Sequence, residues 1–393
     1  MQIQKHPPLS QADLVPDPLV SQLLSSLVHH GLREQSRSEC FFLDSGCPRP
    51  RGGESGDPRG RWPRPHPALH PRVCEGEQLV GPRYYELWIA YIAPARRCDV
   101  KDDAAPLVLG PMSPVIRTAA VMSVKGHLSD NPDKQNQDSY FSFFDESTDT
   151  AVIGVLDGHG EYGAMVANFI ADTLPRELKA SEYYSSDLRL AILDAVKSTE
   201  VHLLRVYHHF CTFSGSTLCM VAFRGDRFYI ANIGDSRAVM GGLEETRQLS
   251  RDHKGNLSDE RARIESCGGR VVTKTYEDGY VGPPRVYLGN RDLPGLAMSR
   301  SIGDVVVRRV GVIAEPEIHE YRMQECAGRV LILATDGLWD FVSNQSAVIT
   351  AAQSHTAYDA VESLVRSCLR EWRAKSPKVI DDITLAVMMF EGT

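Results

Sequence analysis

The chain has 393 residues, a formal net charge of −8, 42% hydrophobic residues and 24% charged residues. This composition is typical of a globular protein, and the acidic balance gives no basic field of the kind that holds nucleic acid. No apolar run approaches the roughly 20 residues of a membrane span, so we expect neither a nucleic-acid partner nor a membrane-spanning segment.

The first residues have neither the charged-then-apolar order of a signal peptide nor a glycine at position 2 for myristoylation. The nine cysteines are scattered without a metal-type pair, a pattern typical of free thiols in a reducing compartment. We therefore expect an intracellular protein, in the cytoplasm or the nucleus.

Proline divides the chain into two parts. Residues 1–114 hold 16 of the 23 prolines and carry 13 basic and 13 acidic residues. Residues 47–72 are especially rich in Pro, Arg and Gly, and such a stretch cannot bury enough apolar surface to offset its chain entropy. We predict that residues 1–114 form a largely disordered extension, with a short helix over 19–32 and a strand or helix over 84–93. A docking segment for a partner or an anionic surface is the alternative.

From residue 115 onward the hydrophobic pattern becomes regular. Helical spacing and start signals predict helices over residues 162–179, 187–210, 256–267, 344–354 and 357–375. Short apolar runs bounded by turn residues predict strands over residues 151–156, 217–223, 227–233, 237–240, 330–334 and 383–390. Short strands mixed with paired helices favour an α+β layered domain over one with alternating strands and helices.

Carboxylates stand at the ends of four of these strands. Asp157, Asp235 and Asp336 follow apolar strands, and Asp381 and Asp382 precede another. A single Asp in a turn is common, but four on one pattern can converge on one rim of packed strands. Clustered carboxylates repel one another unless a divalent cation neutralises them, and all-oxygen ligation favours Mg²⁺ or Mn²⁺. The sequence therefore predicts a metal site.

His159 lies two residues after Asp157, between two glycines. Glycine on both sides lets the backbone approach a ligand closely and adopt unusual angles. A core histidine is the alternative interpretation, but a loop flanked by glycine is a poor place for one. A protonated imidazole here can donate a proton to a leaving group.

Seven motifs in order resemble those of the type 2C metal-dependent Ser/Thr protein phosphatases, over residues 115–390. They are Asp157-Gly158-His159-Gly160, Ser214-Gly215-Ser216-Thr217, Gly234-Asp235-Ser236-Arg237, Asp252-His253-Lys254, Leu296-Ala297-Met298-Ser299-Arg300-Ser301-Ile302-Gly303-Asp304, Thr335-Asp336-Gly337-Leu338-Trp339-Asp340 and Asp381-Asp382-Ile383-Thr384. The resemblance implies a four-layer α-β-β-α sandwich, in which two antiparallel sheets are flanked by paired helices. Residues 115–393 would be the catalytic domain, with a flap at about 256–293 that touches substrate.

The same resemblance implies a binuclear Mn²⁺ or Mg²⁺ site with a weaker third ion. By motif, Asp157 would bridge two ions, the Gly158 carbonyl would bind one of them, and Asp336 and Asp381 would hold the other. Asp235 together with Asp336 would serve the third ion.

Two positions depart from the most familiar family pattern. Gln137, followed by Asp138, stands where many members have a Glu that acts on a metal through water; some members share this form. The phosphate-binding Arg is not evident, and Lys125 and Lys134 are the candidates in its place. A lysine would bind phosphate as a point charge rather than through a bidentate fork.

The implied activity is hydrolysis of phosphoserine and phosphothreonine in a phosphoprotein by a metal-activated water, with His159 as the general acid and a monomeric enzyme. A thiol phosphatase is excluded because no cysteine is followed six residues later by Arg. A binuclear metallophosphoesterase would need a His where Arg291 stands. The remaining alternative is a weak or inactive scaffold of the same fold, which would have lost metal ligands that this chain retains.

Overall fold

The computed structural model describes residues 107–109, 116–275 and 281–392 of the chain. The helix expected over 19–32, the element expected over 84–93 and the disorder expected for most of residues 1–114 lie outside the described residues. Strand β1 (Leu107–Leu109) lies ahead of residue 115, within the stretch assigned to the extension, and it pairs with β2 (Ile116–Val124).

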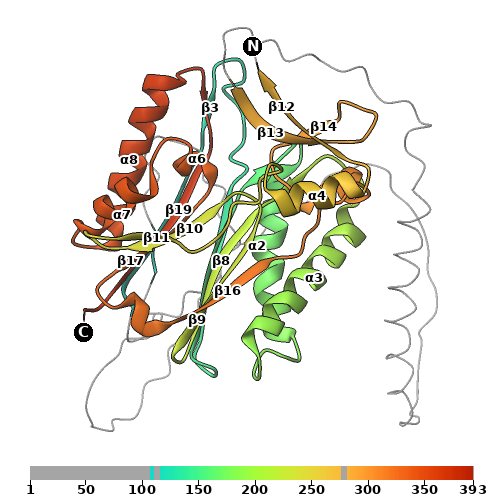
Figure 1. Ribbon diagram of the computed structural model, residues 1–393. Coiled ribbons are helices and arrows are strands. Elements are labelled where there is room, and N and C mark those ends of the chain that lie inside the picture. The colour runs from blue at the N-terminus through green and yellow to red at the C-terminus, as the bar shows by residue number, and fades with distance from the viewer. Residues whose placement is uncertain (1–106, 110–115, 276–280, 393) are drawn as a thin grey trace, which may run out of the picture. The chain divides into compact units, whose positions relative to one another are not determined.

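Two antiparallel sheets form the centre of the domain (Figure 1). The six-stranded sheet has the order β1, β2, β19 (Ile383–Phe390), β17 (Val330–Ala334), β10 (Arg237–Gly241) and β11 (Thr246–Gln248). The five-stranded sheet has the order β16 (Glu317–Arg322), β9 (Arg227–Ile233), β8 (Leu218–Arg224), β5 (Thr150–Leu156) and β4 (Ser139–Asp145). All neighbouring strands of both sheets pair antiparallel.

The central strands are apolar throughout because both of their faces are buried. In β17, Leu331 and Leu333 point into the core between the sheets, whereas Val330 and Ile332 pack under helices on the outer side. Strand β5 divides its side chains in the same way. Successive side chains of a strand point to opposite faces, so a strand between two apolar layers loses the polar alternation of a surface strand.

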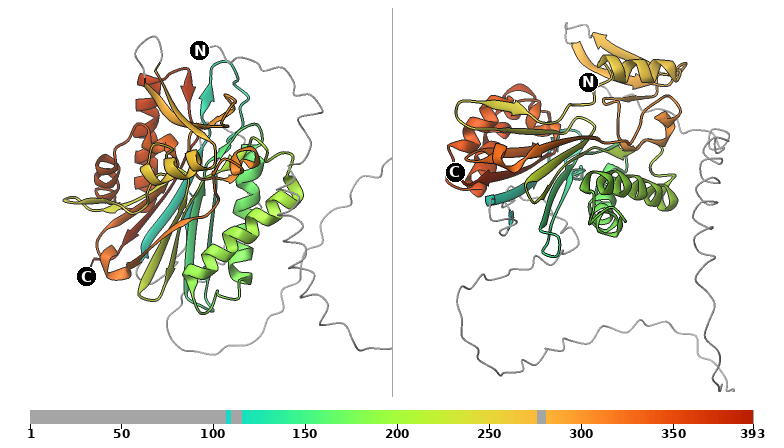
Figure 2. Two further views of the ribbon diagram at one scale, coloured as in Figure 1. Left: turned by 45° about the vertical axis from the view of Figure 1, so that its right-hand side comes forward. Right: turned by 60° about the horizontal axis from the view of Figure 1, so that its bottom comes forward.

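Paired helices cover the outer face of each sheet, as Figures 1 and 2 show. Helices α2 (Gly163–Ala180) and α3 (Leu188–Tyr207) share one core with the five-stranded sheet. Helices α7 (Asn344–Ala352) and α8 (Ala357–Lys375) share another core with the six-stranded sheet. The Asp187 side chain caps α3, and Thr356 with Asp359 forms a capping box on α8. The predicted four-layer sandwich is confirmed.

Smaller elements complete the domain. The described residues of the stretch expected to form the flap, 256–293, include helix α4 (Ser258–Ser266) and strands β12 (Arg270–Thr275) and β13 (Val281–Tyr287). Strand β14 (Pro294–Leu296) follows this stretch and completes a three-stranded sheet with β12 and β13. A second small sheet joins β6 (Gly158–His159), β7 (Gly215–Ser216) and β15 (Ile302–Gly303), which is followed by the short helix α5 (Val305–Arg308). Strands β3 (His127–Leu128) and β18 (Val379–Ile380) pair with each other, and helix α6 (Asp336–Trp339) and the 3₁₀ helix η3 (Met323–Cys326) flank β17.

Candidate active site

Four strands from the two sheets bring the predicted acidic residues to one end of the sandwich. Asp157 directly follows β5, and Asp235 follows β9 after Gly234, whose φ of 92° requires glycine. Asp336 follows β17 and begins α6, and Asp381 lies just before β19. The apolar strands therefore fix the positions of the polar residues at their ends.

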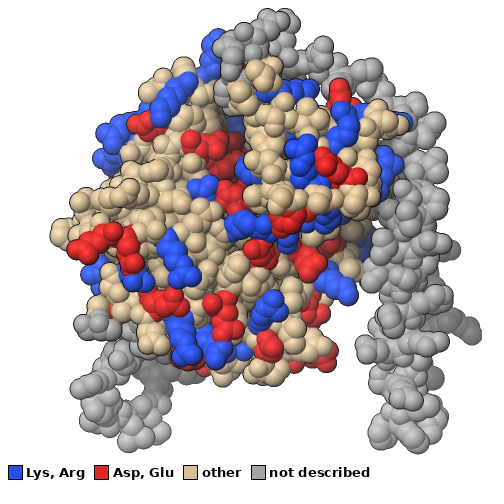
Figure 3. All heavy atoms as spheres, in the orientation of Figure 1, with Lys and Arg blue, Asp and Glu red and all other residues tan. Residues whose placement is uncertain are grey.

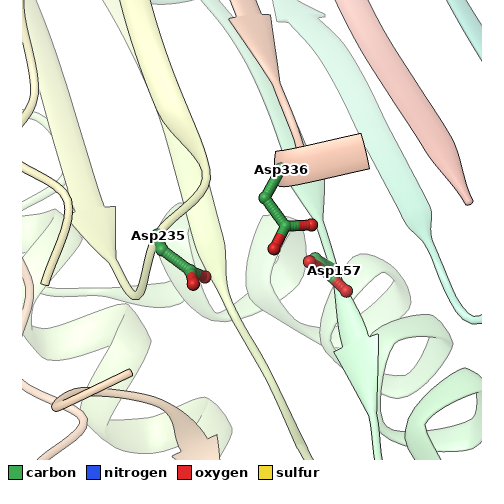
Figure 4. Close-up of side chains that lie close together, drawn as sticks. All are labelled: Asp157, Asp235 and Asp336. Carbon is green, nitrogen blue, oxygen red and sulfur yellow. The ribbon is translucent and has the colours of Figure 1, made fainter. Parts of the chain in front are cut away.

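Three of these side chains form one group. Carboxylate oxygens of Asp157, Asp235 and Asp336 all lie within 4.8 Å of one another, and Figure 4 shows the three side chains close together at the ends of their strands. Figure 3 shows acidic atoms in a hollow of the surface beside the flap. Three carboxylates at this spacing form an oxygen-donor set that can hold a hard divalent ion.

The acidic group is only partly neutralised by positive charge, because Lys254 pairs with Asp235. Burial raises the pKa of Asp157 and of Asp336 well above the usual range, and the charges of neighbouring carboxylates raise both further. Oδ1 of Asp235, a residue only 1% exposed, has no hydrogen-bond partner among the described residues. Buried polar atoms are normally paired, so an open carboxylate oxygen here fits a cation as its missing partner.

Asp381 lies beside this group rather than within its 4.8 Å set. Burial raises its pKa, and the adjacent charge of Asp382 raises it further; Asp381 in turn raises the pKa of Asp157 and Asp336. Asp381 and the three acids of the group therefore form one acidic cluster of four interacting carboxyls. Only the three acids of the group have carboxylate oxygens within 4.8 Å of one another.

Asp382 organises the loops around the cluster. Its Oδ1 accepts hydrogen bonds of 2.6 Å from the Gly126 backbone N–H and from Lys134 Nζ, and its Oδ2 accepts one of 2.8 Å from the Gln137 backbone N–H. Lys134 is thus held at the edge of the cluster by an ion pair. The other predicted phosphate-binding residue, Lys125, is near Pro132, with 3.4 Å between Nζ and the carbonyl oxygen.

Gln137 and Asp138 connect the acidic cluster to the glycine-rich loop. Gln137 Nε2 donates to the Gly160 carbonyl at 2.7 Å, and the Gln137 carbonyl accepts from the Gly158 N–H at 3.2 Å. Asp138 is buried and accepts a hydrogen bond of 2.9 Å from the Thr335 hydroxyl. An added Cβ at Gly158 would lie 2.4 Å from the Gln137 carbonyl oxygen, so only glycine fits this packed position.

His159 is oriented by a buried carboxylate from a distant part of the chain. Its Nε2 lies 2.6 Å from Asp304 Oδ2, which also accepts a 2.7 Å hydrogen bond from the Ser301 hydroxyl. Burial lowers the pKa of His159, but the Asp304 charge and hydrogen bond outweigh burial and leave this pKa above its ordinary value. His159 Nδ1 has no hydrogen-bond partner within the described part of the chain. The arrangement favours an imidazolium with one N–H free.

The structure adds two charged residues to the site that the sequence does not predict. Asp304 and Lys254 both lie within the family motifs, but their contacts are evident only in the fold. Asp304 orients His159, and Lys254 Nζ forms an ion pair with Asp235. Asp304 has a φ of 47° without being glycine; a residue held in this unusual conformation is a signal that only the structure supplies.

The chain matches the family model for protein phosphatase 2C over residues 119–376. That match spans more than half of the chain and includes every acidic residue of the cluster except Asp381. The chain belongs to the protein phosphatase 2C family of serine/threonine phosphatases.

Plant proteins are among the relatives of this phosphatase 2C chain. It is 37% identical to "Probable protein phosphatase 2C 64" of Oryza sativa subsp. japonica, over 70% of this chain and 66% of the relative. It is 33% identical to "Probable protein phosphatase 2C 52" of Arabidopsis thaliana, over 65% of this chain and 63% of the relative. It is 34% identical to "Probable protein phosphatase 2C 72" of the same organism, over 71% of this chain and 87% of the relative. The chain therefore spans just under two thirds of the length of the first two.

Solved structures support the fold of this family member. The serine-threonine phosphatase 2C of Toxoplasma gondii aligns with a TM-score of 0.62 at 23% identity, over 73% of this chain and 99% of the other. A sex determining protein of C. elegans aligns with a TM-score of 0.56 at 21% identity, over 71% of this chain and 65% of the other. No helix among the described residues is long and apolar enough to cross a membrane.

Proposed function

We propose that this phosphatase 2C chain hydrolyses phosphoserine and phosphothreonine in phosphoprotein substrates and depends on divalent metal ions for this activity. The observation that carries the proposal is the group of Asp157, Asp235 and Asp336, whose carboxylate oxygens lie within 4.8 Å of one another. The raised pKa values of Asp157 and Asp336, which result first from burial and then from neighbouring carboxylates, support a site adapted to a cation.

The donor set fits Mn²⁺ or Mg²⁺, which prefer oxygen ligands. We assign two ions to Asp157, the Gly158 carbonyl, Asp336 and Asp381, and a weaker third ion to Asp235 together with Asp336. When bound, these ions supply a water nucleophile that is active near neutral pH and neutralise charge on the phosphoryl group. Gln137 and Asp138 hold the surrounding loops without being direct ligands.

His159 is proposed to protonate the departing serine or threonine oxygen. Nε2 is engaged by Asp304 at 2.6 Å, so the proton to be transferred is assigned to Nδ1, which is buried and unpartnered among the described residues. Asp304 stabilises the positive charge of the protonated ring before the proton is transferred.

The remaining roles are proposed from sequence and placement. Lys134 and Lys125 are the candidates for binding the substrate phosphate, and Lys134 lies nearer to the acidic cluster through its ion pair with Asp382. Residues 256–293 form the flap that contacts substrate. We propose a monomeric, intracellular enzyme of the cytoplasm or nucleus, with residues 1–114 as an N-terminal extension whose strand β1 joins the six-stranded sheet of the catalytic domain.

Hydrolysis of p-nitrophenyl phosphate and of a phosphothreonine peptide by the full chain tests the proposal. The metal-stripped protein in EDTA should be inactive, and Mn²⁺ or Mg²⁺ should restore turnover. Asp157→Asn should abolish the restored activity without loss of folding. Full activity in EDTA would contradict the metal requirement, whereas a folded protein that binds Mn²⁺ but never turns over would show the inactive scaffold.

A further inference from the structure

Lys254 places a positive charge at one corner of the acidic group. Its Nζ forms an ion pair with Asp235 Oδ2; the Lys254 side chain is 29% exposed and that of Asp235 is 1% exposed. Burial raises the pKa of Asp336 and of Asp340, and in both cases the charge of Lys254 opposes the rise. The ammonium therefore acts on three carboxylates, and among the described residues it forms an ion pair with Asp235.

The backbone fixes this ion pair. The His253 N–H donates to the Gly234 carbonyl at 2.8 Å, and the Gly234 N–H donates to His253 Nδ1 at 3.1 Å. His253 is fully buried. Because Lys254 and Asp235 are the next residues on the two paired segments, this clamp sets their side chains opposite each other. The contact is built into the fold and is not a chance meeting of mobile surface groups.

Asp235 remains incompletely paired despite this contact. Lys254 engages Oδ2, while Oδ1 is buried and has no hydrogen-bond partner among the described residues. Carboxylate oxygens of Asp157 and Asp336 lie within 4.8 Å of those of Asp235. A divalent ion at this corner would thus bind the same carboxylate that already carries the ammonium charge.

We propose that Lys254 is a resident cation that competes with divalent ions for Asp235 and so keeps ion binding at this corner weak. The inference rests on the proposed metal dependence and concerns only the number and affinity of the ions. An incoming ion must either displace the ammonium or lie close to it, and both cost free energy because like charges repel at short range. The two ions assigned to Asp157, Gly158, Asp336 and Asp381 do not require Asp235.

Calorimetric titration of metal-stripped full chain with Mn²⁺ measures this competition. Lys254→Met removes the charge and keeps the length of the side chain. We expect the weak binding event of the wild type to become tighter by at least about tenfold, while Lys254→Arg keeps it weak. In the double variant Lys254→Met with Asp235→Asn, the gain should disappear, which assigns it to Asp235.

Lys134→Met is the matched control, because it also removes a lysine charge at the cluster but one that pairs with Asp382. It should not tighten the weak event. Unchanged Mn²⁺ affinities in Lys254→Met would overturn the inference, and so would a gain in affinity that remains after Asp235→Asn is added. If Lys254→Met does not fold, Lys254→Gln also removes the charge and gives the same measurement. A wild-type chain that binds no Mn²⁺ would instead contradict the proposed function.

Discussion

The acidic cluster and the region around Glu260 in α4 bury carboxylates in opposite ways. Glu260 is fully buried and accepts hydrogen bonds from Arg263, Arg300 and the Ser299 hydroxyl. Burial alone would raise its pKa, but these partners hold it well below the usual range. Asp157 and Asp336 have mainly other carboxylates as neighbours, and their pKa values are raised. The charge of Glu260 is balanced by its own protein partners, whereas the acidic cluster is only partly balanced by Lys254 and leaves room for a bound cation.

Breaking the compensated region should have the largest effect. Glu260→Ala leaves the charges of Arg263 and Arg300 without their shared partner, and we expect the free energy of unfolding to fall by about 3–5 kcal/mol. Urea denaturation measures the change. Glu265→Ala, which removes a half-exposed i,i+4 partner of Arg261, should cost about 0.5 kcal/mol or less. Equal losses in the two variants would contradict the comparison.

Asp336→Asn should have the largest effect on activity. The substitution keeps size but removes a charge that offsets a divalent ion, so turnover of p-nitrophenyl phosphate should fall by on the order of 10². The metal-free protein should not lose stability, because one repelling charge has gone. Asp340→Asn is the control: Asp340 lies outside the three-carboxylate group and its loss should be milder. A milder effect at Asp336 than at Asp340 would reverse the assignment.

The two regions should also respond differently to pH. The folded-state pKa values of Asp157, Asp138 and Asp336 are raised, mainly by burial. The stabilisation that results from these raised pKa values is fully present below the unfolded-state pKa near 4. It is lost as the pH rises through the folded-state pKa values. The folded-state pKa of Glu260 is lowered instead, so this residue contributes a stabilisation that is constant above about pH 5 and is lost only at lower pH.

We therefore expect the melting temperature of the metal-free protein to fall between pH 5 and pH 8, and saturating Mn²⁺ to reduce this fall by stabilising the ionised carboxylates. Differential scanning calorimetry in EDTA and in Mn²⁺ makes the measurement. In Asp336→Asn the slope without metal should be shallower. A metal-free melting temperature that rises over this range would contradict the raised pKa values.

The smallest effect is expected from shortening the N-terminal extension. Deletion of residues 1–104 keeps β1 and removes no residue of the site, so kcat for p-nitrophenyl phosphate should change by less than about twofold. Deletion of residues 1–110 also removes β1, an edge strand paired with β2, and should lower the melting temperature while leaving kcat similar. A large loss of kcat in a folded 1–104 deletion would show that the extension completes the site.

The sequence predicted the elements that have a continuous apolar run or clear helical spacing. The strands expected over 330–334 and 383–390 and the helix over 357–375 agree with the structure residue for residue. Strand β16 was missed because Glu317–Arg322 mixes charged and apolar residues at the edge of its sheet. Strands β2 and β4 were also missed.

In the site, the convergence of Asp157, Asp235 and Asp336 followed from their places at strand ends. The contacts of His159 with Asp304 and of Asp235 with Lys254 did not, because they join segments 145 and 19 residues apart through loops whose course only the fold determines. Nor does the sequence show that Asp381 lies beside the three-carboxylate group instead of within it.

Calorimetric titration of Mn²⁺ into the metal-stripped wild type and into folded Asp336→Asn tests the central claim most directly. If these three carboxylates form a cation site, the wild type binds Mn²⁺ and the substitution weakens binding by at least about tenfold, because Asp336 lies close to both Asp157 and Asp235. Equal affinity for Mn²⁺ in the two folded proteins would contradict the claim.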